Sequence, residues 1–233
     1  MPLPPISHDY EPASAAEQAA LSASDPLVIV AASVRIRIDP VYYRLGLAGS
    51  EPQIRVREPV AKALARVAAA LPAGLGLTLL DGFRSRATSL AIFERIKGEI
   101  AAANPDWDGA RLEQETRRFC AHPSDPGHYP VPPHLSGGAI DLLLHDLASG
   151  EPLDFGTGFD DISERAESDY FERPCAGMSE ARRLQIRDNR RLLFWLMRRE
   201  GFSNYPGEWW HFYLGDCLWA RFRGGEYRYP AAE

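Results

Sequence analysis

The sequence predicts one α+β domain built on a central, mainly antiparallel sheet that is flanked by helices. Hydrophobic residues make up 45% and charged residues 25% of the 233 residues, which is typical of a globular chain with a sizeable core. Segments with strand and helix patterns do not alternate regularly, which favours α+β over a doubly wound fold. No repeat or low-complexity linker divides the sequence. We therefore expect a single domain over residues 27–233, preceded by an N-terminal extension over residues 1–26.

The first half of the chain predicts two strands and three helices. The expected elements are a strand over 27–38, a helix over 58–71, a strand over 75–81, a helix over 85–103 and a helix over about 108–119. In the first strand, Val34, Ile36 and Ile38 alternate with arginines, as in a half-buried strand. The first helix has Pro59 in its first turn and Pro72 after its end. The segment LGLTLLD is typical of a buried strand, and the helix that follows it keeps its apolar residues on one face until Asn-Pro stops it.

The second half predicts a constrained loop, three strands and one long helix. The expected elements are a loop over 121–133, a strand over 139–144, a helix over 179–200 and strands over 208–214 and 217–222. The loop holds five prolines, and the strand after it has the apolar sequence AIDLLL. Ser179 is the expected N-cap of the long helix and Gly201 its left-handed terminator. The segment EWWHFYL predicts an aromatic strand, with which 217–222 is expected to pair.

Charge and composition exclude several classes of function. With 26 Lys and Arg against 32 Asp and Glu, the net charge is −6, which argues against partners such as nucleic acid or an anionic membrane surface. No apolar run approaches the roughly 18 residues of a membrane span, and the first residues lack the pattern of a secretory signal. The three cysteines form no C-x-x-C motif, so we expect reduced thiols in a cytoplasmic protein. The sequence does not indicate the oligomeric state.

Two short motifs contain candidate metal ligands. His134 opens H-L-S-G-G-A-I-D, which ends at Asp141, and His211 closes E-W-W-H, which begins at Glu208. Two imidazoles and one carboxylate are a common zinc set in hydrolases, because they leave a fourth position for water. Zinc lowers the pKa of that water, and Glu208 is the candidate base that takes its proton.

The spacing within each motif constrains where these residues can lie. His134 and Asp141 are an odd seven residues apart, so they cannot share one face of a straight strand. Since two glycines separate them, we expect His134 in the loop before the strand and Asp141 on the inward face of the strand. The glycine before Glu208 suggests a bend there, with His211 inside the following strand. Each residue alone is more typical of a structural role, but a carboxylate buried in AIDLLL needs a cation, a metal or several donors. The set as a whole therefore indicates chemistry.

These motifs resemble a known family. H-x-x-G-x-A-x-D together with E-x-W-H is similar to the zinc D-alanyl-D-alanine dipeptidases of the VanX type, which belong with the zinc D,D-carboxypeptidases and share a fold related to the Hedgehog signalling domain. The resemblance extends to D-G-F-R at 81–84, to G-x-x-F-D at 156–160 and to E-G-F at 200–202. It covers roughly residues 28–215, which is most of the chain.

The resemblance implies a role for each matching position. His134, Asp141 and His211 would hold one zinc ion. Glu208 would be the general base and then the proton donor to the leaving amine. Arg84 would stabilise the oxyanion, for which a permanently charged guanidinium is suited. The alternative for Arg84 is a structural salt bridge with a residue such as Asp81.

The resemblance also bears on the substrate. Asp160 matches the carboxylate that receives the ammonium group of a dipeptide, and its alternative is a solvated loop residue. Where the family usually has a serine close before the first ligand, this chain has Pro132 and Pro133, so the side-chain preference of the dipeptide stays open.

The sequence therefore predicts zinc-dependent hydrolysis of a small dipeptide, with D-Ala-D-Ala as the expected substrate. Such an activity would recycle cell-wall dipeptides or lower the D-Ala-D-Ala pool. One alternative is a D,D-carboxypeptidase or L,D-peptidase that acts on cell-wall peptides. Another is a non-catalytic binding module on the same fold, against which the presence of Glu208 and Arg84 argues.

Overall fold

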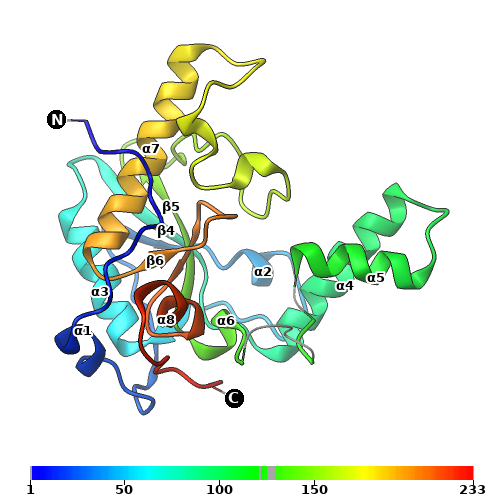
Figure 1. The fold of residues 1–233 in the computed structure, drawn as a ribbon, viewed down its shortest axis with the longest axis horizontal. Coiled ribbons are helices and arrows are strands. Elements are labelled where there is room, and N and C mark those ends of the chain that lie inside the picture. The colour runs from blue at the N-terminus through cyan, green and yellow to red at the C-terminus, as the bar shows by residue number, and fades with distance from the viewer. Residues whose placement is uncertain (1, 121, 125–129, 233) are drawn as a thin grey trace.

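The centre of the fold is a twisted sheet with five strands in the order β2-β4-β5-β7-β6 (Figure 1). The computed structural model describes residues 2–120, 122–124 and 130–232, and the five strands of this sheet are those found among these residues. The strands are β2 (Ile36–Ile38), β4 (Leu75–Asp81), β5 (Ala139–Asp146), β7 (His211–Tyr213) and β6 (Ser203–Asn204). All neighbours pair antiparallel except β2 and β4, which are parallel. The predicted α+β fold with a mainly antiparallel sheet is confirmed.

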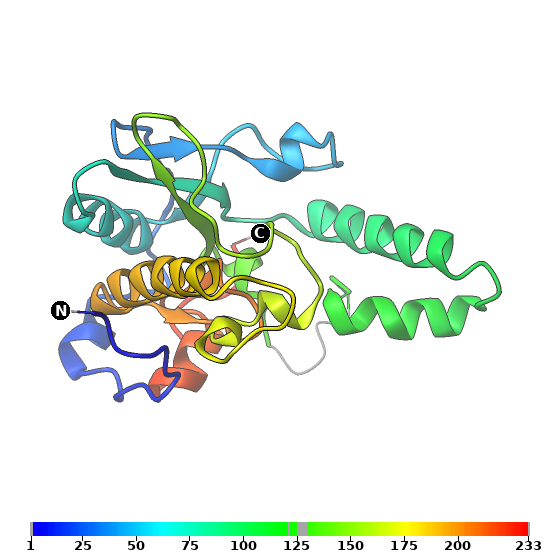
Figure 2. The ribbon, with the colours of Figure 1, turned by 90° about the horizontal axis from the view of Figure 1, so that it is seen from above.

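Helices surround this sheet, and a small ribbon of β1 (Leu27–Ile29) and β3 (Arg55–Arg57) lies beside it. The helices are α1 (Ala15–Ala19), α2 (Val41–Arg44), α3 (Glu58–Ala70), α4 (Arg86–Ala103), α5 (Gly109–Phe119), α6 (Pro133–Ser136), α7 (Glu180–Arg199) and α8 (Cys217–Arg223), with short 3-10 turns η1 (Glu164–Ala166) and η2 (Tyr170–Glu172). Helices α3 and α7 contact each other, whereas α4 and α5 form a hairpin that projects from the body (Figure 2). Among the described residues, no helix has both the length and the apolar character needed to cross a membrane.

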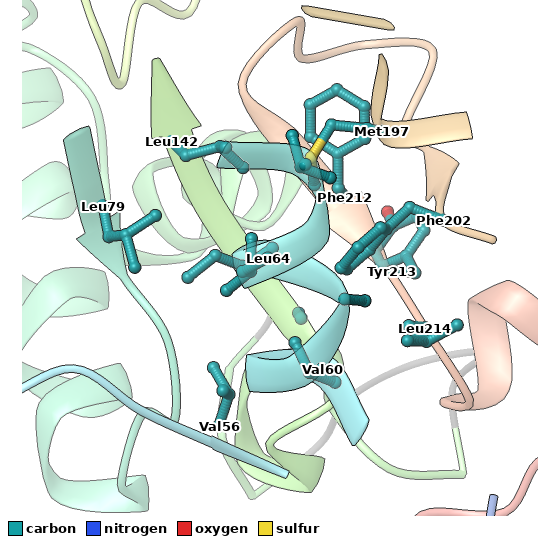
Figure 3. Packing of buried hydrophobic residues seen from close by; sticks show 14 of the residues in the cluster. Val56, Val60, Leu64, Leu79, Leu142, Met197, Phe202, Phe212, Tyr213 and Leu214 are labelled. Carbon is teal, nitrogen blue, oxygen red and sulfur yellow. The ribbon is translucent and has the colours of Figure 1, made fainter. Parts of the chain in front are cut away.

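The main core lies between α3 and one face of the sheet (Figure 3). Val60 and Leu64 of α3 meet Leu79 of β4, Leu142 of β5 and Phe212 of β7, and each of these side chains is at most 1% exposed. Full burial of such side chains contributes about 1.5–3 kcal/mol each relative to an exposed position. The apolar pattern of α3 and of the two central strands therefore explains why these elements form and pack as predicted.

Several predicted elements match the structure closely. Strand β4 spans the predicted 75–81, α3 begins at the predicted residue, and α5 starts one residue after the predicted start at 108. The side chain of Ser179 caps α7 by accepting a hydrogen bond from the Arg182 amide at 3.3 Å. Gly201 follows the helix with φ +93°, a conformation that glycine adopts at no steric cost. Of the predicted loop over 121–133, residues 121 and 125–129 lie outside the described residues.

The prediction of one strand over 27–38 is wrong. The segment forms β1 and β2, which belong to different sheets, and a tight turn separates them. In that turn the Ser33 amide donates to the Ile36 carbonyl at 2.9 Å, and Val34 is 86% exposed. The alternation of apolar and basic residues continues through the turn, so periodicity alone could not reveal it.

The prediction of a strand over 217–222 is also wrong, because this segment forms α8. Gly215, with φ +79°, ends the preceding strand region. The Asp216 carboxylate then caps the helix by accepting a hydrogen bond from the Trp219 amide at 2.8 Å. An Asp before a short apolar segment was the signal for a helix start that the strand assignment overlooked.

Candidate metal centre

The three predicted metal ligands lie together. One ligand atom from each of His134, Asp141 and His211 lies within 4.8 Å of the other two. His134 Nε2 is 3.3 Å from Asp141 Oδ2 and 3.1 Å from His211 Nδ1. His211 Nδ1 lies 2.5 Å from Asp141 Oδ1. All three residues are buried. Residues up to 77 positions apart in the chain therefore meet in one buried polar cluster.

Strand pairing accounts for two of these positions. In the register of the sheet, Asp81 of β4 lies opposite Asp141 of β5, and Asp141 lies opposite His211 of β7. Directly opposite residues share one face of a sheet. The neighbouring pair Ile140 and Phe212 faces the core below α3, and successive residues point to opposite faces. The sheet therefore carries a row of two carboxylates and one imidazole on the face away from that core.

His134 reaches this row from α6 and not from the predicted loop. Pro133 begins this single helical turn, a position where the fixed φ of proline suits a helix. Gly137 ends the turn with φ +74°, and its amide donates to the His134 carbonyl at 3.1 Å. A Cβ on Gly137 would lie 2.4 Å from Leu27 Cδ2, and the left-handed backbone conformation also favours glycine there. The proline pair that predicted a loop instead starts the helix.

Two buried arginines fix the irregular segments around the cluster. Arg57 donates from Nε to the Ser136 carbonyl at 2.8 Å, which holds the end of α6. Arg190 of α7 donates to the carbonyls of Phe155 at 2.8 Å and Glu167 at 2.6 Å, which holds the long segment between β5 and α7. Backbone carbonyls in loops that lack a ladder partner are thus paired with side chains.

The donor atoms of the cluster fit a zinc ion. His134 Nδ1 lies 2.7 Å from the Gly82 carbonyl oxygen, which can only accept, so Nδ1 carries a hydrogen. Nε2 is then the ring nitrogen that faces Asp141 and His211, which is the usual arrangement of a metal-binding histidine. Tetrahedral zinc with bonds of about 2.0–2.1 Å places its ligand atoms roughly 3.3 Å apart. The distances of 3.1 and 3.3 Å from His134 Nε2 match this spacing, whereas His211 Nδ1 and Asp141 Oδ1 lie closer, at 2.5 Å.

Electrostatics favour a cation at the cluster. Burial alone would raise the pKa of the Asp141 carboxyl, but the charges and hydrogen bonds of His134 and His211 outweigh burial and hold that pKa below its ordinary value. Burial would lower the pKa of His211, but the charge and hydrogen bond of Asp141 raise it overall. Asp141 is therefore a carboxylate in a water-poor site that attracts positive charge.

Glu208 lies at the predicted bend. Strand β7 begins only at His211, and residues 208–210 precede it, so the predicted strand over 208–214 is too long. The Glu208 amide donates to the Tyr205 carbonyl at 3.1 Å, and the His211 amide donates to the Glu208 carbonyl at 3.3 Å. The half-buried Glu208 lines the same cavity as His211, and burial raises the pKa of its carboxyl to about 7.

Arg84 lies next to the cluster and forms a salt bridge with Asp81, the structural role expected as the alternative to a catalytic one. Its Nη2 is 2.8 Å from Asp81 Oδ2 and 3.7 Å from Asp141 Oδ2. Asp81 also lies 3.3 Å from His134 Nδ1, so it contacts both the arginine and a candidate ligand. The guanidinium still lines the cavity, with its side chain 15% exposed. The salt bridge therefore orients Arg84 toward the cavity.

Asp160 lies at the rim of the cavity, where a tyrosine that the sequence analysis did not assign contacts it. The Tyr42 hydroxyl donates to the Asp160 carboxylate, at 3.1 Å from both oxygens, and accepts from Arg84 Nη2 at 3.3 Å. Asp160 has φ +61°, which is uncommon for a residue other than glycine. Tyr42 precedes Asp160 by 118 residues, so no local pattern could link them.

The cluster opens into a cavity of about 1050 Å³. One end is lined by the three candidate ligands and by Glu208 and Trp210. The other end runs along the hairpin of α4 and α5, which projects from the body (Figure 2). A substrate in this cavity can therefore reach the cluster while it contacts the hairpin.

Comparisons with known proteins identify relatives over this same region. The Peptidase_M15 family, described as D-ala-D-ala dipeptidase, matches residues 48–223, a range that includes every predicted site residue. A D-alanyl-D-alanine dipeptidase of Synechocystis sp. is 32% identical over 154 residues, which cover 62% of this chain and 61% of that protein. One of Enterococcus faecalis is 33% identical over 152 residues, which cover 61% of this chain and 64% of that protein. The matched part is thus less than two thirds of the length of these relatives.

One solved structure also resembles the fold. It is the vancomycin resistance D,D-pentapeptidase VanY in complex with Zn(II), with a TM-score of 0.45 and 17% identity over 77% of this chain and 82% of that chain. This likeness is too weak to bear on the site, whereas the family match spans most of the chain. The chain belongs to the Peptidase_M15 family of D-ala-D-ala dipeptidases.

Proposed function

We propose that this chain is a zinc peptidase that hydrolyses a small dipeptide, with D-Ala-D-Ala as the expected substrate. The observation that carries this proposal is the convergence of His134, Asp141 and His211, whose ligand atoms lie within 4.8 Å of one another. These residues would hold one ion per chain. Zinc bound there supplies Lewis acidity, which polarises a peptide carbonyl and acidifies water.

In this proposal Glu208 moves the proton. It takes a proton from the attacking water and then donates it to the leaving amine. Its position supports this role, because Glu208 lines the cavity and lies one turn from His211. The presence of a carboxylate at this position also favours an enzyme over a pure binding module, which has no need of a base.

Arg84 and Asp160 would bind two different groups of the dipeptide, the carbonyl oxygen of the reacting bond and the ammonium group. Arg84, held by its ion pair with Asp81, faces the cavity and stabilises negative charge on the carbonyl oxygen in the transition state. Asp160 accepts the ammonium group of the dipeptide, and the Tyr42 hydroxyl orients its carboxylate. In this proposal a free dipeptide lies between the Asp160 carboxylate and the candidate metal centre, which line the same cavity.

Removal of the metal is expected to abolish hydrolysis reversibly. Incubation of the purified chain with a chelator should reduce turnover of D-Ala-D-Ala to background, and added zinc should restore it. The measurement is the release of D-alanine from a panel of dipeptides of both stereochemistries, with and without chelator. Undiminished turnover in metal-free protein would contradict the proposal.

Asp160→Asn is expected to weaken binding of the free dipeptide. Loss of a charged hydrogen bond costs about 1.5–3 kcal/mol, so KM for D-Ala-D-Ala should rise roughly 10- to 100-fold. Steady-state kinetics on D-Ala-D-Ala and on its N-acetylated form measure this, because only the free dipeptide carries an ammonium group. Asp161→Asn is the matched control, since that neighbouring carboxylate is bonded within its own loop to Ser163. An equal rise in KM for both substrates would remove Asp160 from ammonium binding.

A second candidate substrate is a longer cell-wall peptide that ends in D-Ala-D-Ala. The cavity of about 1050 Å³ favours it, because α4 and α5 extend the cavity far beyond the size of a dipeptide. Pockets for drug-sized ligands measure about 300–1,000 Å³. An assay of free D-Ala-D-Ala against a muramyl pentapeptide separates the two. Preference for the pentapeptide would assign the chain as a D,D-carboxypeptidase.

A further inference from the structure

Asn204, the last residue of β6, uses both hydrogens of its side-chain amide on the turn that carries Glu208 and His211. Its Nδ2 donates to the Glu208 carbonyl at 3.1 Å and to the His211 carbonyl at 2.9 Å. The side chain thus ties the residue that would be the base to a candidate ligand. Asn204 is 1% exposed, so water does not compete for these bonds.

The side-chain carbonyl oxygen of Asn204 also has two polar partners. Asn204 Oδ1 accepts a hydrogen bond from Ser168 Oγ at 2.6 Å and faces His8 Nε2 at 3.1 Å. Because a hydroxyl hydrogen and an imidazole N–H both suit a carbonyl oxygen, these contacts fix which end of the amide faces the turn. The backbone N–H of Asn204 also donates to the Tyr10 hydroxyl at 2.8 Å. The N-terminal segment therefore contacts Asn204 at two points.

The turn keeps other hydrogen bonds that do not depend on Asn204. The His211 amide donates to the Glu208 carbonyl at 3.3 Å, and the Tyr205 amide donates to the His211 carbonyl at 3.0 Å. If the Asn204 side chain were removed, both carbonyls would keep a backbone partner. Loss of the amide is therefore expected to loosen the turn without unfolding the protein, which separates positioning from folding.

We infer that Asn204 is a positioning residue that sets the spacing between Glu208 and the ligand atom of His211. The backbone at these two residues decides where the carboxylate and the imidazole lie, and one amide nitrogen holds both carbonyls. Ser168 and His8 keep the amide in the required orientation. The inference rests on the proposed function only for its activity and zinc-affinity readouts.

Asn204→Ala and Asn204→Asp test this role. In Asn204→Ala we expect kcat for dipeptide hydrolysis to fall roughly 10- to 100-fold, KM to change little and zinc affinity to fall about tenfold, the range seen for partners that orient metal ligands. In Asn204→Asp the loss should be larger, because a carboxylate oxygen then faces two carbonyl oxygens. Zinc affinity is measured by competition with a chromogenic chelator.

Asn189→Ala is the matched control. Its side chain also donates to a backbone carbonyl, that of Asp154 at 2.8 Å, but on a different segment. It should retain wild-type kcat and zinc affinity. His8→Ala should cause a smaller loss of the same kind, and adding it to Asn204→Ala should cause no further loss, because both act through one amide.

Amide hydrogen exchange gives a readout that does not depend on activity or zinc. In metal-free protein, the amides of Glu208 and His211 should exchange faster in Asn204→Ala than in Asn189→Ala. Equal exchange, or wild-type kcat and zinc affinity in both Asn204 variants, would overturn the inference. Failure of the unmodified chain to bind zinc would overturn the proposed function instead, and the exchange comparison would still decide the role of Asn204.

Discussion

Glu208→Gln is expected to retain zinc and to lose about 100- to 10,000-fold in kcat for dipeptide hydrolysis. The substitution preserves the shape of the side chain, but an amide cannot take a proton from water, and general acid–base catalysis contributes effects of this size. The fold should not change, since Glu208 takes part in the hydrogen bonds of the turn through its backbone. Kinetics and zinc content of the same preparation measure both halves of the prediction.

Glu151→Gln is the control for this experiment, because Glu151 is exposed beside the far end of β5. It should hydrolyse the dipeptide at the wild-type rate. Full activity of Glu208→Gln would exclude Glu208 as the base and would leave the proton transfer to another group in the cavity.

His211→Ala is expected to lose both zinc and activity. The substitution removes one of three donors and leaves the buried Asp141 carboxylate without its closest partner. Zinc affinity should fall by more than about 100-fold, since even residues that only orient ligands change affinity by roughly 10- to 100-fold. Competition with a chelator measures the affinity, and metal analysis after dialysis measures the content.

His145→Ala is the matched control for the loss of a buried imidazole. His145 lies on the same strand as Asp141, is 3% exposed and bonds Thr78 through Nδ1 at 2.9 Å, but it is not in the cluster. We expect a lower Tm with unchanged zinc affinity. If His145→Ala lost zinc as fully as His211→Ala, the loss would reflect damage to the sheet and not removal of a ligand.

Local sequence patterns predicted most of the fold. Helices α3 and α7 were predictable because their apolar periodicity and their terminal residues agree, and strand β4 because its residues form a nearly continuous apolar run. The strand predicted over 27–38 failed because an alternating pattern does not show where the chain turns. The strand predicted over 217–222 failed because the side-chain cap of Asp216 decides for a helix in a segment whose composition suits either state.

The candidate site was predictable only where its residues lie in short motifs. The pair of His134 and Asp141 and the pair of Glu208 and His211 each lie within eight residues or fewer, and their spacing constrained the local backbone. Tyr42 had no such signal, because its partner Asp160 lies 118 residues away. Asn204 lies four and seven residues from Glu208 and His211, but the orientation of its side chain depends on His8, 196 residues away. The role of Asp81 between Arg84 and His134 likewise depends on the register of β4 against β5. Contacts of this kind follow from the packing of the sheet and not from any local pattern.

A crystal structure of the zinc-loaded chain, with anomalous diffraction recorded at the zinc edge, tests the central claim most directly. We expect one anomalous peak per chain, at about 2.0–2.2 Å from His134 Nε2, an Asp141 carboxylate oxygen and a His211 ring nitrogen. No peak at this cluster, or a zinc ion held by other residues, would contradict the assignment of the metal centre and with it the proposed enzyme.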